Sequence, residues 1–167
     1  MLIIVFLIYF NDIVTSLKDL SKKSIKKMLI LLLSLIIVQV ATNTLSVSII
    51  GVNNHYYNNG ILSNYLDKWP ILMSINMIIY YPIVETLVFS KTLKDIINGK
   101  WVFIVCASLF FWLVNLLAFD FTYVSIIATM SCFTTSIVIN YFYYKYDNIS
   151  QIFIVKMIYN LIFLLLP

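Results

Sequence analysis

The chain has 167 residues, a formal net charge of +4, 62% hydrophobic residues and only 11% charged residues. Soluble domains carry about 45–50% apolar and roughly 25% charged residues, so this composition excludes an ordinary soluble domain. The apolar runs are continuous and do not alternate, which favours helices over strands as the way to satisfy the backbone in a bilayer. We therefore predict an all-α, polytopic transmembrane helix bundle in the cell membrane.

Six apolar segments follow one another along the chain, and we predict about six spans. A span needs about 20 apolar residues, with a range of about 17–25. The first segment is short for a span and is interrupted by Asn11 and Asp12, whereas the other five are long enough. In chain order, the segments cover residues 2–17, 28–52, 69–90, 101–119, 122–144 and 149–166.

The lysines predict the orientation of these segments, because an excess of lysine marks cytoplasmic loops. If all six segments cross, nine lysines lie on one side, only Lys68 lies on the other, and both termini are outside. Trp69, Trp101 and the aromatic cluster at 141–144 fall at the predicted interfaces, as an aromatic belt would. The nine predicted cytoplasmic lysines are Lys18, Lys22, Lys23, Lys26, Lys27, Lys91, Lys94, Lys100 and Lys145.

Residues 1–167 show no domain boundary, internal repeat or low-complexity tail, so we predict one integral membrane domain. The only sizeable external segment, 53–64, holds the only histidine, His55, and we interpret it as a solvated loop. Cys106 and Cys132 lie in apolar segments and have neither a disulfide framework nor a metal-site spacing. We expect no metal or cofactor. The positive charge follows topology and indicates no nucleic-acid partner.

Small polar side chains follow one face of the fifth segment at spacings of three or four residues. Small residues at this spacing let helices approach closely, so we interpret the stripe as a packing face rather than a substrate path. The stripe consists of Thr122, Ser125, Thr129, Cys132, Ser136 and Asn140. A similar stripe in the second segment consists of Gln39, Asn43 and Ser46.

Two opposite charges lie inside the predicted spans. Glu85, the only glutamate, is in the third segment, and Lys156 is the only lysine within a span. From a rise of ~1.5 Å per residue, both lie about 9–12 Å from the cytoplasmic end. A charged residue at a helix centre costs roughly 2.5–3.5 kcal/mol, so we predict that the two residues pair. Pro82 is expected to kink its helix and to free a backbone carbonyl near Glu85.

Three short motifs lie in order in the second half of the chain. The first, residues 82–91, reads Pro-Ile-Val-Glu-Thr-Leu-Val-Phe-Ser-Lys and contains Glu85. The second, Phe-Trp-Leu-Val-Asn, ends at Asn115, and the third, Lys-Met-Ile-Tyr-Asn, runs from Lys156 to Asn160. Together they resemble the motifs of the CPBP superfamily (CAAX proteases and bacteriocin-processing enzymes, the Abi family). Those motifs read Pro-Ile-x-Glu-Glu-x-x-Phe-Arg-Gly, Phe-x-x-x-His and His-x-x-x-Asn.

This resemblance covers residues 58–166, the CPBP-like core, and implies roles for four positions. In active members the first glutamate and the histidine of the second motif activate a water, and the third motif stabilises the oxyanion. Glu85 and Asn160 keep the family's residue types, whereas Asn115 and Lys156 stand where the family has histidines. An asparagine can form hydrogen bonds but cannot accept a proton as a general base.

The substitutions favour a catalytically impaired member that acts by binding, similar to lysostaphin-resistance-A-like and bacteriocin-immunity proteins. It would serve bacteriocin self-immunity or scaffold another membrane or cell-wall protein in a bacterial cytoplasmic membrane. Its partners would be the lipid bilayer and another membrane protein or a bacteriocin-related peptide. Two alternatives are an active CPBP intramembrane endopeptidase that uses Glu85 and an unrelated small transporter subunit. A fourth interpretation makes Glu85 and Lys156 a purely structural ion pair.

Overall fold

The computed structural model describes residues 8–18, 20, 22–51, 68–117, 119 and 121–165. Within these residues the regular structure is helical, without a strand, which confirms the predicted all-α class. The predicted external loop with His55 and the first part of the predicted core, 58–67, lie outside the described residues. The helices that are described fall into six segments, one for each predicted apolar segment.

The first two segments are α2 (Phe10–Lys18) and α3 (Lys22–Ile50). The third is one rod of five stretches: α5 (Pro70–Ile75), the π-helix η1 (Asn76–Tyr80), α6 (Tyr81–Glu85), the π-helix η2 (Thr86–Thr92) and α7 (Leu93–Ile96). The fourth is α8 (Lys100–Leu116), the fifth comprises α9 (Tyr123–Ala128) and α10 (Met130–Tyr146), and the last is α11 (Ile149–Leu165).

Three of these segments are long and apolar enough to cross a membrane, namely Ser24–Ile50, Pro70–Ile96 and Tyr123–Tyr146. α8 and α11 are apolar helices of 17 residues each, at the lower end of the length range for a span. The described part of the first segment, α2, has nine residues. Six spans and the predicted orientation therefore stay predictions.

Two helices extend further than predicted, and lysines account for both differences. Lys26 and Lys27 lie inside α3, and Lys91 and Lys94 lie inside the third rod, although we had expected all four in loops. Lysine is a good helix former, and its long stem can carry the charge from the end of a span to the interface. A run of lysines is therefore a poor marker of where a membrane helix ends.

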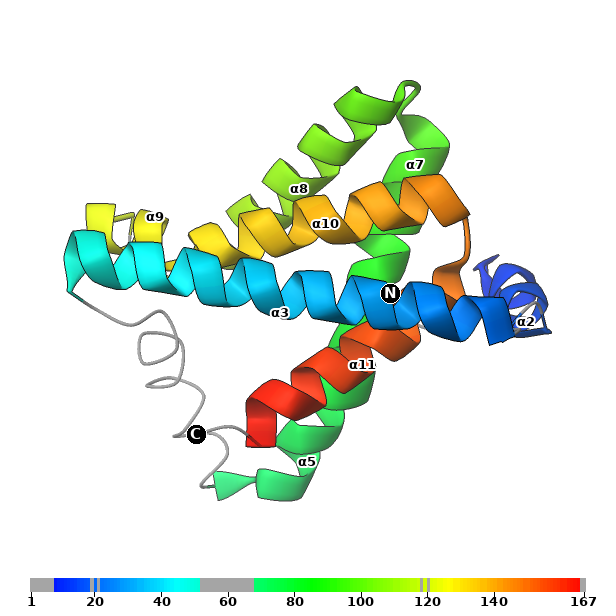
Figure 1. Ribbon diagram of the computed structural model, residues 1–167, viewed down its shortest axis with the longest axis horizontal. Coiled ribbons are helices and arrows are strands. Elements are labelled where there is room, and N and C mark those ends of the chain that lie inside the picture. Colours follow the sequence, from blue (N-terminus) through cyan, green and yellow to red (C-terminus); the bar gives the residue numbers. More distant parts are fainter. Residues whose placement is uncertain are drawn as a thin grey trace.

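Figure 1 shows α3 and α10 side by side along the long axis, with α8 and α11 on either side and the α5–α7 rod crossing them. α3 turns Leu31 and Leu35 inward, 1% and 0% exposed, and turns Leu33 and Ile37 outward, 59% and 65% exposed. A helix with exposed leucine and isoleucine on its outer face suits lipid rather than water. The fold thus agrees with a protein embedded in lipid.

The polar stripe of the fifth segment is a packing face, as predicted. Asn140 is 1% exposed and lies at the centre of a hydrogen-bond network between three helices. Its side-chain oxygen accepts from Ser90 of η2 at 2.8 Å, and its nitrogen donates to Ser136 at 3.1 Å and to Ser108 of α8 at 3.3 Å. The network joins α8, α10 and the third rod.

The first residue of one predicted stripe is exposed, whereas the last residue of the other is buried. Thr122 is exposed and caps α9 by accepting a hydrogen bond from the Ser125 amide, so it is not part of the packing face. In the second stripe, Ser46 is 3% exposed and donates to the Ile127 carbonyl of α9 at 3.3 Å. Threonine favours the cap position because its hydroxyl replaces a missing backbone partner there.

We predict that Asn140→Ala lowers the free energy of unfolding by about 2 kcal/mol, since it removes three interhelical or intrahelical bonds worth about 0.6 kcal/mol each in membranes. The measurement is denaturant unfolding in bicelles followed by circular dichroism. Asn98→Ala, at an exposed position between α7 and α8, is the matched control. Equal stability of the two variants would contradict a stabilising role for the Asn140 network.

Candidate functional site

An ion pair joins the third rod to the last helix in the apolar part of the bundle. The ammonium nitrogen of Lys156 lies 2.6 Å from Oε2 of Glu85, and the two side chains are only 10% and 23% exposed. The pair expected from the depths of the two residues is thereby confirmed. A charge-assisted bond of this length between largely buried groups holds α6 and α11 in one register.

Lys156 is buried because it shares a helix face with apolar residues. Ile152 and Phe153, four and three residues before Lys156, are 3% and 7% exposed, and Lys156 itself is 8% exposed. Residues three or four apart lie above one another on a helix, so packing of this apolar face carries Lys156 inside with it. A lysine in that position requires a compensating charge, and Glu85 supplies it.

The second motif contributes an aromatic ring to the same place. The Lys156 ammonium lies 5.3 Å from the centroid of Phe111 on α8, within the range of a cation–π contact. Phe89, from the first motif, meets Phe111 edge-on with ring centroids 5.2 Å apart. All three motifs therefore converge around the ion pair, through Glu85 and Phe89, Phe111, and Lys156.

Asn160 has a different partner, and Pro82 explains it. In η1 the backbone bonds run five residues back, as the Tyr81 amide shows by donating to the Asn76 carbonyl. Pro82 has no N–H, so the next carbonyl in this pattern, that of Met77, loses its helical donor. The side-chain nitrogen of Asn160 donates to that carbonyl at 2.7 Å. Pro82 thus leaves the Met77 carbonyl, eight residues before Glu85, without its helical donor, and Asn160 satisfies it. That such a carbonyl lies near Glu85 stays a prediction.

The rod stays helical through Pro82, and the predicted kink stays a prediction. The residues that flank α6, Tyr80 and Thr86, keep right-handed helical backbone angles. A proline ring clashes with the carbonyl four residues earlier, and the wider π-helical turn relieves that clash. The Thr86 hydroxyl also donates to the Pro82 carbonyl at 2.7 Å.

Asn115 uses its side-chain nitrogen within its own helix, donating to the Phe111 carbonyl at 2.8 Å. Among the described residues, no hydrogen bond joins Asn115 or Asn160 to Glu85 or Lys156. Of the four predicted site residues, Glu85 and Lys156 are in contact in the structure. The side chains of the two asparagines instead donate to backbone carbonyls. The roles of the four residues in any reaction stay predictions.

Sequence reasoning missed the Met77 carbonyl as the acceptor for Asn160. The type of a residue does not show whether its main-chain carbonyl is free, and hydrophobic periodicity does not show where an α-helix changes to a π-helix. The only signal was Pro82: the carbonyl five residues before it, in the π-helical pattern, is that of Met77, whereas the α-helical pattern points four residues back. The contact of Phe111 with Lys156 was open to prediction, because Phe111 belongs to the second motif.

The comparisons with known proteins agree with this convergence of motifs. A family model described as type II CAAX prenyl endopeptidase Rce1-like matches residues 67–162, which is more than half of the chain and includes all three motifs. The chain belongs to this family, within the CPBP superfamily. Neither the curated proteins nor the solved structures gave a match.

Family membership makes the chain a membrane protein of the CAAX protease superfamily. The third rod also packs against both α8 and α11, the three segments that carry the motifs. The alternative of an unrelated transporter subunit would have gained support if these segments did not pack together. The family match and the packing both oppose that alternative.

Glu85→Ala is predicted to lower the free energy of unfolding by about 3–5 kcal/mol, because it leaves Lys156 buried without a counter-charge. The charge swap Glu85→Lys with Lys156→Glu should recover much of this loss. The control is Asp95→Ala, which breaks a more exposed i,i+4 pair with Lys91 and should cost no more than about 1 kcal/mol. If Glu85→Ala and Asp95→Ala are equally stable, the buried pair does not hold the helices together.

A second prediction concerns the carbonyl freed by Pro82. Asn160→Leu should destabilise the wild-type chain by about 1 kcal/mol, the scale of a hydrogen bond between membrane helices. In a Pro82→Ala background the loss should be smaller, since the restored amide can serve the Met77 carbonyl. A double-mutant cycle of unfolding free energies measures this coupling. Additive effects of the two substitutions would refute it.

Proposed function

We propose that this chain is a catalytically impaired member of its family that acts by binding another protein or a peptide. Bacteriocin self-immunity, or scaffolding of another membrane or cell-wall protein in a bacterial cytoplasmic membrane, would be such a role. The observation that carries the proposal is the Lys156–Glu85 ion pair, with 2.6 Å between Nζ and Oε2. It places an ammonium group on the one carboxylate that the family would use as a base.

A general base must reach the proton it removes at about 2.6–3.2 Å, directly or through one water. In this chain the Lys156 ammonium already donates a hydrogen bond to Oε2 of Glu85 at 2.6 Å, which is within that range. The second base position holds Asn115, whose amide has no nitrogen that accepts a proton. A water at this site would therefore face a carboxylate engaged by lysine and no imidazole to assist it.

The oxyanion side of the site is depleted as well. Oxyanion stabilisation needs donors that are preorganised and free to meet the developing charge. The side-chain nitrogen of Asn160 already donates to the Met77 carbonyl, and Lys156 is held by Glu85. Loss of several members of a cooperating site removes most of its rate enhancement.

Two further positions of the first motif support a structural rather than a chemical use of this region. Thr86 stands where the family has its second glutamate, is 0% exposed and bonds to the Pro82 carbonyl. Ser90 stands where the family has arginine, is 2% exposed and donates to Asn140. Both side chains are buried and hydrogen-bonded within the bundle, so these two motif positions now serve helix packing.

An active intramembrane endopeptidase is the second candidate, and one observation favours it. The family match covers Glu85, and the Glu85 side chain retains 23% exposure, so the carboxylate is not sealed off. In that case Lys156 would act as a donor to the substrate rather than as a permanent partner of Glu85. The two candidates differ in whether Glu85 is needed for peptide cleavage.

The deciding experiment compares the purified wild-type chain with the neutral double variant Glu85→Gln/Lys156→Met, which removes both charges and leaves no unpaired ion. We expect no difference in cleavage of prenylated CAAX peptides or of bacteriocin precursors, because neither chain has a working base. The charge-swapped chain should keep its protective or partner-binding role in cells. Peptide cleavage by the wild-type chain that the neutral variant lacks would show an active endopeptidase.

A further inference from the structure

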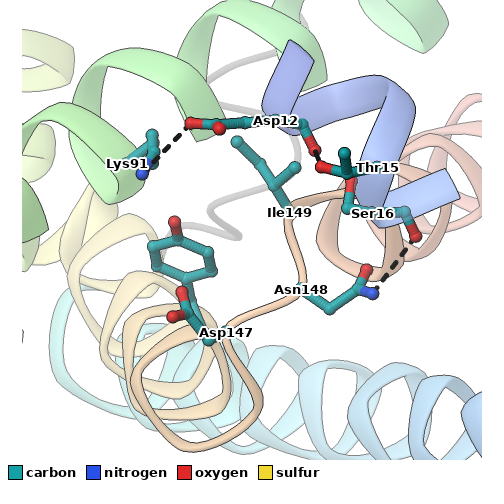
Figure 2. A pocket seen from close by; sticks show the side chains of 8 residues that line it. Asp12, Thr15, Ser16, Lys91, Asp147, Asn148 and Ile149 are labelled. Carbon is teal, nitrogen blue, oxygen red and sulfur yellow. Dashed lines mark hydrogen bonds and ion pairs between the residues drawn. The ribbon is translucent and has the colours of Figure 1, made fainter. Parts of the chain in front are cut away.

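A polar cleft of about 190 Å³ lies between α2, η2 and the junction of α10 and α11, and Lys91, the last residue of the first motif, is the one motif residue among those that line it. Figure 2 shows Asp12 and Lys91 on its upper side and Asp147 and Asn148 on its lower side. Since one water occupies about 30 Å³ of liquid, the cleft has room for a small polar group. Its lining residues are Asp12, Thr15, Ser16, Lys91, Tyr143, Asp147, Asn148 and Ile149.

The cleft presents acceptors rather than donors. Lys91 is bridged by Asp12 at 3.3 Å and by Asp95 at 3.2 Å, and Lys94 is held by Asp147 at 2.6 Å. The lysine side chains are 21% and 19% exposed, whereas the side chains of Asp12 and Asp147 are 52% and 71% exposed. Asp12 and Asp147 line the cleft, and each keeps one carboxylate oxygen outside these ion pairs. These two oxygens suit a cationic ligand.

Tyr143 supplies an independent observation. Its side chain is 2% exposed and lines the cleft, and among the described residues no hydrogen bond reaches its hydroxyl. The Lys94 ammonium lies over the ring of Tyr143, 4.8 Å from its centroid. A buried hydroxyl without a partner is costly, so such groups in native proteins are nearly always satisfied. This hydroxyl is positioned to bond to a group in the cleft.

The surroundings of the cleft indicate the depth at which the ligand lies. At this end of the bundle, Lys100 lies 4.8 Å from the ring centroids of both Trp101 and Tyr141, and Lys27 lies 4.4 Å from that of Tyr146. Aromatic rings mixed with lysines are typical of the headgroup level of a membrane. The nearby lysines suit a phosphate, and the cleft itself suits an ammonium group.

We propose that this cleft binds the primary ammonium group of a phosphatidylethanolamine headgroup. The ammonium donates to the exposed oxygens of Asp12 and Asp147 and to the Tyr143 hydroxyl, and the headgroup phosphate faces the surrounding lysines. Three N–H donors distinguish this headgroup from phosphatidylcholine, whose quaternary ammonium has none. This site is separate from the Glu85–Lys156 pair and does not depend on the proposed function.

The test is native mass spectrometry of the full chain released from nanodiscs that contain equal parts of phosphatidylethanolamine, phosphatidylcholine and phosphatidylglycerol. We expect phosphatidylethanolamine to be retained about tenfold over phosphatidylcholine, the factor that one charge-assisted hydrogen bond provides. Tyr143→Phe and Asp147→Asn should each reduce this preference. Asparagine tolerates the left-handed backbone of Asp147, which has φ 47°, so the second variant should fold.

Tyr144→Phe is the matched control, because Tyr144 is the neighbouring tyrosine, is 37% exposed and does not line the cleft. It should leave the lipid preference unchanged. Equal retention of the three lipids, a preference for phosphatidylglycerol, or an unchanged preference in Tyr143→Phe would overturn the proposal. Binding of soluble phosphoethanolamine without retention of the lipid would overturn the lipid as the source of the ammonium group.

Discussion

The charge of Lys156 is the constraint on which the arrangement of the last helix depends. An apolar helix face carries this lysine into the bundle, and the cost of an unpaired buried charge requires a carboxylate beside it. Glu85, on α6, is that carboxylate. One helical turn further along α11, Asn160 meets the Met77 carbonyl, so two contacts in antiparallel order set the register between α11 and the third rod.

The Pro82 turn connects this register to the local backbone. Proline removes one amide, the π-helical turn shifts the missing partner to Met77, and Asn160 replaces it from another helix. The proline would weaken an isolated helix, but here the carbonyl that it leaves free accepts a hydrogen bond from a neighbouring helix. The same asparagine that the family is expected to use as an oxyanion donor has a structural partner here. This double use of one region is why stability and catalysis have to be separated by paired substitutions.

Counting residues along helices paired Glu85 with Lys156, and it did not place Asn115 at the depth of that pair. Both helices rise by ~1.5 Å per residue, so equal distance from the same interface was enough to pair Glu85 with Lys156. Asn115 lies further along α8 by the same count, and in the structure it bonds to Phe111 of its own helix. Linear depth predicts which residues can meet, but tilt and the choice of neighbour decide which do. Phe111, one turn earlier, is the residue of α8 that contacts Lys156.

Composition and pattern by themselves determined the membrane class, the helical fold, the order of six helical segments, the packing face around Asn140 and the pairing of Glu85 with Lys156. Each depends on hydrophobicity, on helical periodicity or on the cost of a buried charge, and all three can be evaluated along a single chain. Only the tertiary structure decided the acceptor of Asn160, the extension of two helices through their lysines and the burial of a Tyr143 hydroxyl that has no hydrogen bond within the described part of the chain. These features depend on backbone register and on what neighbouring helices bury, and neither is encoded in the type of any one residue.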